Sequence, residues 1–211
     1  MSIESLSHEI PDIPKAGLQG MNGFDPDKRV DVKEANTVEK PTSGFDPDKR
    51  VEPDKILEEV KNGERKLETS QEKGNYGEMR TDQDLKEKGY ERISLDRVTD
   101  LNAPGRQGID GVYYKEGGEP EYMIVDSKYG SSQLSDTDDG RQMSEKWIDN
   151  RLDNAVGKEK ADEIRMEKLM NSDNVVSYVA RIGEDGNVTY ERVDSNGYVM
   201  KGMLSDEKSA V

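Results

Sequence analysis

The most apolar run of the chain, "YMIV" at residues 122–125, leads directly into two opposite charges, Asp126 and Lys128. Its aromatic and β-branched residues predict a β-strand over 121–129. Because side chains on a strand alternate between its two faces, Asp126 and Lys128 share one face and Ser127 points to the other. A sheet that contains this strand must therefore accommodate an acid and a base, either as a structural ion pair or as groups that do chemistry.

A second predicted strand, "IDGVYYK" at 109–115, brings an acid of its own, Asp110. The turn "EGGEP" joins the two strands into a hairpin. The hydrophobic pattern predicts three helices and three further strands around this hairpin. The helices are expected at 75–89, 138–157 and 158–170, and the strands at 91–98, 174–183 and 187–194. This order predicts an α+β (mixed α/β) domain with a central mixed sheet flanked by helices.

Composition limits how much of the chain can pack into such a domain. Only 31% of the residues are hydrophobic and 36% are charged, so part of the chain is expected to be disordered. We divide the chain into four regions on this basis. They are a polar, largely disordered tail over 1–53, a mostly exposed connecting helix over 54–73, the folded domain over 74–204 and a C-terminal tail over 205–211.

The polar tail contains an internal repeat. "GFDPDKRV" occurs at Gly23–Val30 and again at Gly44–Val51, and the two copies hold both phenylalanines of the protein, Phe24 and Phe45. Two copies are too few for a solenoid, which needs at least about three stacked units. The repeats are therefore interpreted as turns in a solvated linker, or as a docking or processing segment that a partner recognises through its phenylalanines.

Several classes of chemistry are excluded by residue content. The chain has no cysteine and a single histidine, His8, so disulfides, thiolate metal sites and catalytic triads based on histidine are not expected. A catalytic metal would be held by carboxylates and water, which favours Mg²⁺ or Mn²⁺ over Zn²⁺. No apolar run approaches the ~20 residues that span a bilayer, so no membrane is expected as a partner.

A fourth charged residue completes a candidate site. Glu78 is on the predicted helix that precedes the hairpin, and together with Asp110, Asp126 and Lys128 it gives three carboxylates and one amine. Metal-dependent hydrolysis of phosphodiesters needs this set. Carboxylates hold a divalent ion that activates water, and a lysine orients or deprotonates that water and stabilises the developing charge.

Six stretches in order resemble a known family over about residues 73–183. The family is the C-terminal nuclease toxin domains of bacterial polymorphic toxins, which form the tips of contact-dependent inhibition, LXG/WapA-like and Rhs-type proteins and have a PD-(D/E)xK restriction-endonuclease-like fold. The stretches are "GNYGEM", "GYERISLDRV", "GRQGIDGVYY", "YMIVDSKYG", "DGRQMSEKWIDNRL" and "AVGKEKADEI".

The resemblance implies a role for each residue of the candidate site. Asp110 corresponds to the first metal-binding acid, Asp126 to the second, Lys128 to the catalytic lysine and Glu78 to the acid of the first helix. Gln142 falls where many such nucleases have a polar residue on the helix after the active strand. The chain departs from the family pattern twice, because the proline of its Pro-Asp is Ile109 here and because its motif is D-x-K rather than E-x-K.

The resemblance also implies a setting. The protein would be a metal-dependent DNase, secreted as the effector end of a longer delivery protein, acting in the cytoplasm of a target bacterium and blocked by a cognate immunity protein. Arg106, Gln107 and Arg141 are the expected phosphate contacts. Trp147 is expected in the core. A net charge of −15 opposes binding to a polyanion. We expect the metal ions to offset the active-site acids and local basic residues to form a stripe for the nucleic acid.

Two alternatives stay open from the sequence. The same metal site would hydrolyse RNA, such as tRNA in a target cell, since nothing in the sequence reads a 2′-hydroxyl. In the other alternative the protein is a non-catalytic adaptor with an acidic surface, and Asp126 and Lys128 merely pair.

Overall fold

The computed structural model of the chain describes residues 53–200. The predicted tail with its two repeats and the predicted C-terminal tail at 205–211 lie outside the described residues.

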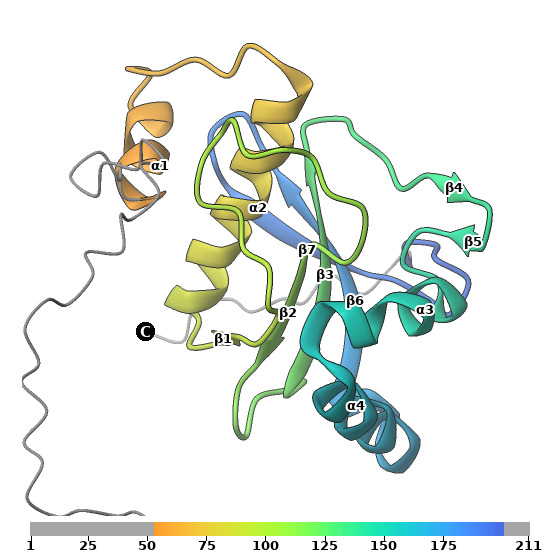
Figure 1. Ribbon diagram of the computed structural model, residues 1–211. Coiled ribbons are helices and arrows are strands. Elements are labelled where there is room, and N and C mark those ends of the chain that lie inside the picture. The colour runs from red at the N-terminus through yellow and green to blue at the C-terminus, as the bar shows by residue number, and fades with distance from the viewer. Residues whose placement is uncertain (1–52, 201–211) are drawn as a thin grey trace, which may run out of the picture. The chain divides into compact units, whose positions relative to one another are not determined.

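A five-stranded mixed sheet forms the centre of the fold (Figure 1). Its spatial order is β1 (Glu91–Arg92), β2 (Gly111–Tyr114), β3 (Tyr122–Tyr129), β6 (Val175–Ile182) and β7 (Val188–Arg192). Neighbouring strands are antiparallel except β3 and β6, which are parallel along all eight residues. The predicted α+β class, with a mixed sheet flanked by helices, is confirmed.

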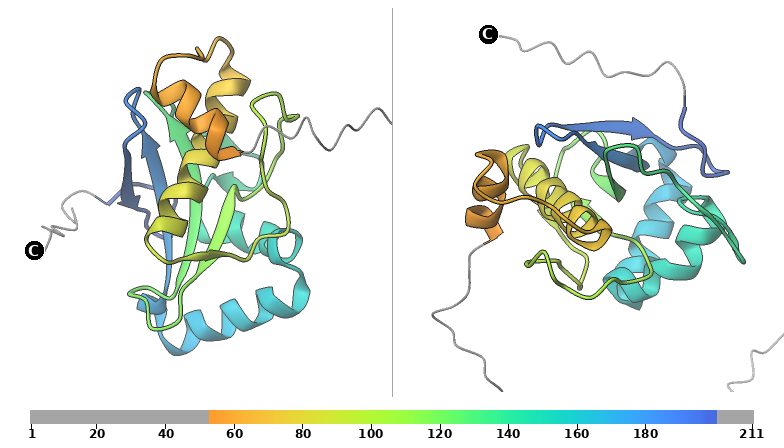
Figure 2. Two further views of the ribbon diagram at one scale, coloured as in Figure 1. Left: turned by 90° about the vertical axis from the view of Figure 1, so that its left-hand side faces the viewer. Right: turned by 90° about the horizontal axis from the view of Figure 1, so that it is seen from above.

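Helices cover both faces of this sheet (Figures 1 and 2). One face packs against α1 (Pro53–Lys61) and α2 (Ser70–Glu87), the other against α3 (Glu145–Val156) and α4 (Lys158–Met170). A small hairpin of β4 (Asp136–Thr137) and β5 (Gly140–Arg141) and the 3-10 turn Ser172–Asn174 complete the order. No helix within 53–200 combines the length and the apolar character that a membrane crossing requires.

Strand β3 separates two apolar cores. Its residues alternate between them, since Ile124 packs with the α3 and α4 side chains, whereas Met123 and Val125 pack with those of α1 and α2. All residues from Tyr122 to Asp126 are buried, and both edges of the strand are paired. Side chains of β3 beyond Val125 are therefore held in fixed directions at one end of the sheet.

The predicted helix over 54–73 is wrong in extent. Helix α1 ends at Lys61, and α2 begins only at Ser70, where Thr69 and Glu72 form a capping box. The predicted boundary at residue 74 thus falls inside α2. Helix α1 is also less exposed than predicted, because Ile56 and Leu57 are buried in the core beneath it.

The predicted strand over 91–98 is shorter than expected. Strand β1 comprises only Glu91 and Arg92. The next two amides, of Ile93 and Ser94, both donate to the carbonyl of Val112, so the regular ladder ends there and the chain leaves the sheet edge.

A buried carboxylate joins α2 to the edge of the sheet. Asp82 is 6% exposed and accepts from Arg92 Nη1 at 2.5 Å, from Arg97 Nε at 2.8 Å and from the Tyr113 hydroxyl. The second Arg92 nitrogen donates to the carbonyl of Asp110 at 2.6 Å. This cluster of Asp82, Arg92, Arg97 and Tyr113, called the Asp82 network below, connects the helix to Asp110, the residue just before β2.

Removing the acid of this network should destabilise the fold strongly. We expect Asp82→Ala to lower the free energy of unfolding by about 3–5 kcal/mol, because it leaves the Arg92 guanidinium buried without its counterion. Urea denaturation monitored by circular dichroism measures this change. Asp173→Ala is the matched control: Asp173 pairs with Arg192 but is 84% exposed, so less than about 1 kcal/mol is expected. Equal losses in the two variants would contradict the assigned role.

Candidate active site

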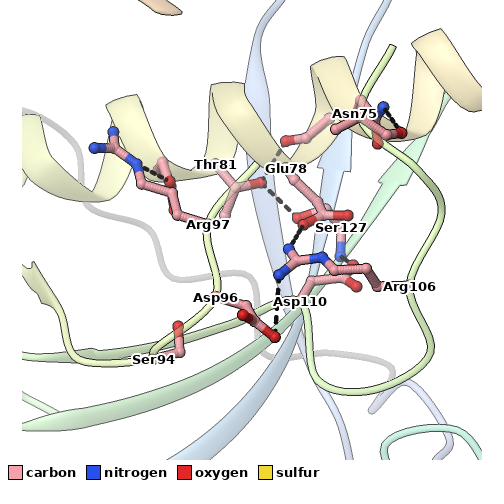
Figure 3. Close-up of polar contacts among 12 residues, drawn as sticks. Asn75, Glu78, Thr81, Ser94, Asp96, Arg97, Arg106, Asp110 and Ser127 are labelled. Atoms are coloured by element: carbon pink, nitrogen blue, oxygen red, sulfur yellow. Dashed lines mark hydrogen bonds and ion pairs between the residues drawn. The ribbon is translucent and has the colours of Figure 1, made fainter. Parts of the chain in front are cut away.

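The register of the β2–β3 hairpin sets two carboxylates side by side. Gly111 pairs with Val125, and continuing this antiparallel register by one residue places Asp110 opposite Asp126. The Ser127 amide donates to Asp110 Oδ2 at 2.8 Å. The Ser127 hydroxyl instead contacts Thr81 of α2 at 2.9 Å, on the other face of the sheet (Figure 3). The expectation that Ser127 points away from Asp126 and Lys128 agrees with this contact.

Asp126 and Lys128 form an ion pair at the end of β3. Lys128 Nζ lies 2.7 Å from Asp126 Oδ2, and the two side chains are 16% and 2% exposed. The contact is short, but Asp126 Oδ2 has no aligned hydrogen bond with any group in the described residues. The charges are therefore paired, while one carboxylate oxygen still has an unused hydrogen-bonding direction.

Helix α2 brings Glu78 to the same site. Its Oε2 accepts from Arg106 Nη2 at 3.2 Å, and Arg106 Nη1 lies 3.4 Å from Asp96 Oδ2 (Figure 3). Arg106, which the sequence suggested as a phosphate contact, is thus located at the site. In this structure it neutralises acids of the protein.

A cavity of about 560 Å³ unites these groups. Of the eight residues that the sequence singled out, seven line it, and Arg141 does not. The lining comprises Glu78, Arg106, Gln107, Asp110, Asp126, Lys128 and Gln142, together with Gly74, Gly108, Ser127, Thr137, Asp138, Asp139, Trp147 and Arg151. Side chains from α2, β3, α3 and the loops on either side of the sheet therefore converge on one space.

Gln142 reaches the cavity from a different element than predicted. It lies between β5 and α3, because α3 begins only at Glu145 behind its cap Ser144. Its side-chain oxygen accepts from the Ser135 amide at 2.8 Å, and its own amide donates to the Ser135 carbonyl at 2.9 Å. The predicted helical position of Gln142 is wrong, and this residue closes the base of the β4–β5 hairpin.

The placement of the two arginines near this hairpin was not foreseen. Arg141 points away from the cavity, since its Nε donates to the Gly197 carbonyl at 3.0 Å and its guanidinium lies over the Tyr198 ring. Arg151 of α3 lines the cavity instead and stacks over Trp147. Trp147 is 2% exposed, so its predicted core position is confirmed, although one side of it also forms the cavity wall.

The electrostatics of the site disfavour three ionised acids. Burial raises the pKa of Asp110 well above its ordinary value, and repulsion from Asp126 and Glu78 adds to this rise. Burial also raises the pKa of Asp126 against the opposing effect of Lys128. The pKa of Glu78 is raised by burial as well, despite the nearby Arg106. A cation placed among these carboxylates would relieve both the repulsion and the loss of hydration.

The donor set suits a hard divalent ion, although the groups are not yet arranged around one. Oxygen donors of three carboxylates are the type that Mg²⁺ and Mn²⁺ prefer, and Asp126 Oδ2 is short of a hydrogen bond. Within 53–200, however, no group of three or more acidic or histidine side chains is disposed to hold a metal. Ion binding would require Lys128 Nζ and the Arg106 guanidinium to move aside from their acids.

Comparisons of the chain with protein-family models, with curated proteins and with solved structures give no match. What the site does must therefore be inferred from its own residues.

Proposed function

We propose that the protein is a metal-dependent endonuclease that hydrolyses phosphodiester bonds in DNA. The observation that carries the proposal is the convergence of Glu78, Asp110, Asp126 and Lys128 on one cavity, with the pKa of each carboxyl raised. Buried acids that repel one another are unfavourable for folding, so their presence beside a cavity favours a functional reason.

Each residue has a role on this proposal. Asp110 and Asp126 would hold Mg²⁺ or Mn²⁺, with Glu78 completing the donor set. When bound, the ion would lower the pKa of a water molecule and polarise a phosphoryl oxygen. Lys128 lines the same cavity, so after the ion displaces it from Asp126 it would orient the attacking water and stabilise negative charge that develops on the phosphate.

The adaptor alternative explains only part of the site. It accounts for the Asp126–Lys128 ion pair, which the structure contains. It gives no reason for Asp110 next to Asp126, or for the cavity above them. A purely structural pair would be more stable without two further carboxylates nearby, which favours the catalytic alternative.

The setting in the cell follows from the resemblance of the sequence to polymorphic toxin tips. On this proposal the domain is the secreted effector end of a longer delivery protein. It acts in the cytoplasm of a target bacterium, and a cognate immunity protein protects the producing cell. The substrate would be DNA, with RNA cleaved at the same site as the alternative.

The first test is digestion of plasmid DNA and total tRNA by the purified chain. We expect plasmid cleavage with Mg²⁺ or Mn²⁺, none with EDTA, and at least about a hundredfold lower rate for Asp126→Asn, because one metal donor is weakened. Asp173→Asn, at an exposed residue that does not line the cavity, is the matched control and should cut like wild type. Cleavage of tRNA alone would assign RNA as the substrate, and equal cutting by the Asp126 variant would refute the site.

The second test separates function from stability at Asp110. Because folding raises the pKa of Asp110, its ionised form opposes folding. The protonated form gives its full stability below the unfolded pKa of about 3.8, and this is lost as pH rises through the folded pKa. Asp110→Asn should therefore melt higher than wild type at pH 8, by about 3 °C for each kcal/mol gained.

The higher melting temperature of Asp110→Asn should approach that of wild type as the pH falls toward 4. The variant should lack nuclease activity at every pH. Differential scanning calorimetry without divalent ions measures the melting temperatures. A variant that melts lower than wild type at pH 8 would show that the Asp110 charge stabilises the fold, contrary to the electrostatics described above.

A further inference from the structure

Arg151 is held at the cavity by four contacts. It lies on α3, and its Nη1 is 2.6 Å from Asp139 Oδ2 while Nη2 is 3.3 Å from Asp139 Oδ1. Nη1 also donates to the Trp147 carbonyl at 3.1 Å, and the guanidinium carbon lies 4.3 Å from the centre of the Trp147 ring. The planar fork of Arg151 thus faces a carboxylate with both nitrogens, in the geometry that also suits a phosphate.

The counterion of Arg151 comes from a small separate element. Asp139 is in the turn of the β4–β5 hairpin, whose strands are two residues long. Hydrogen bonds from Arg151, Thr137 and Asn150 lower the pKa of Asp139, so it is ionised at neutral pH. Besides this ion pair and the Asn150 contact, Arg141 connects the hairpin to the rest, since its Nε donates to the Gly197 carbonyl.

Arg151 differs from the other cations that line the cavity. Lys128 is paired with the buried Asp126, and Arg106 is bound to Glu78 of α2. Asp126 is on the central strand and Glu78 on a long helix, although Arg106 also pairs with Asp96 of the loop after β1. The carboxylate that pairs with Arg151, Asp139, is on the short hairpin. Arg151 also lines a second, smaller cavity that adjoins Asp110, so this residue borders both spaces.

The wall beneath Arg151 contains an unused donor. Trp147 is 2% exposed, and its Nε1 has no hydrogen-bond partner among the described residues. A buried N–H without a partner is uncommon. Trp147 also lines the cavity, so the guanidinium of Arg151 lies over a ring that borders this space.

We propose that Arg151 binds a backbone phosphate of the nucleic acid, and that Asp139 occupies the place of this phosphate in the free protein. The proposal rests on the nuclease function proposed above. A phosphate that takes over the two guanidinium contacts releases Asp139, and with it the β4–β5 hairpin, from α3. The ion pair between Arg151 and Asp139 then acts as a latch that the substrate opens.

The inference predicts that substitutions of Arg151 and of Asp139 change DNA affinity in opposite directions. Binding of the full chain to a fluorescent double-stranded oligonucleotide is measured by anisotropy in EDTA at several salt concentrations. Arg151→Gln should weaken binding about tenfold and lower the salt slope by about one, because one phosphate contact is lost. Asp139→Asn should tighten binding several-fold, since the carboxylate that competes with phosphate is gone. Arg141→Gln, the matched control on the hairpin, should bind like wild type.

The outcomes separate this inference from the nuclease proposal. Any one of three results would overturn the inference about Arg151. They are equal affinities of the Arg151 and Arg141 variants, weaker or unchanged binding by Asp139→Asn, and no DNA binding by wild type. If DNA is cut with metal but one of these results is obtained, the inference fails while the nuclease proposal stands. If the variants bind DNA as expected but no DNA is cut, the nuclease proposal fails while the inference about Arg151 stands. Circular dichroism confirms folding, and Arg151→Lys, which keeps the charge but loses the fork, should fall between wild type and Arg151→Gln.

Discussion

The geometry of the candidate site depends on the ion pair between Asp82 and Arg92. Asp82 is one turn of α2 beyond Glu78, so both carboxylates lie on the same side of the helix. Arg92 binds Asp82 with one nitrogen and the carbonyl of Asp110 with the other. The position of Glu78 relative to Asp110 is therefore fixed through a single guanidinium. A buried ion pair of this kind contributes little net stability against an apolar substitute, but it determines which groups meet.

The same region shows how folding energy is balanced against a reactive arrangement. The apolar residues of β3 are buried on both faces, and this burial holds the end of the strand where Asp126 and Lys128 lie. Loss of hydration and mutual repulsion act against the acids at this end. The strand can tolerate them because its long parallel pairing with β6 continues past Asp126 to Tyr129.

Local patterns in the sequence predicted the hairpin and the acids on it, because period-two alternation fixes which side chains share a face of a strand. Asp110 and Asp126 were also predicted as neighbours, and the register of β2 and β3 agrees. The split between α1 and α2 was missed, because the helix formers at 64–68 were read together with those before residue 62. The sequence does mark the break, since Gly63, at φ 76°, follows the end of α1 and Thr69 caps the start of α2. Arg141 and Arg151 could not be assigned from spacing, since a short hairpin and a helix turn them in different directions. Tertiary contacts alone determine which of them reaches the cavity.

The proposed binding of DNA has to overcome the negative charge of the chain itself. At a net charge of −15, long-range attraction of DNA is not available, although salt screens charges beyond about 8 Å under physiological conditions. Three cations that line the cavity, Arg106, Lys128 and Arg151, each have a carboxylate partner in the structure. A phosphate can therefore enter only by exchange with a carboxylate, which leaves the number of ion pairs unchanged. Such exchange is easiest where the carboxylate is on an element that can move, and Asp139 on the β4–β5 hairpin meets this condition better than Asp126 on the central strand.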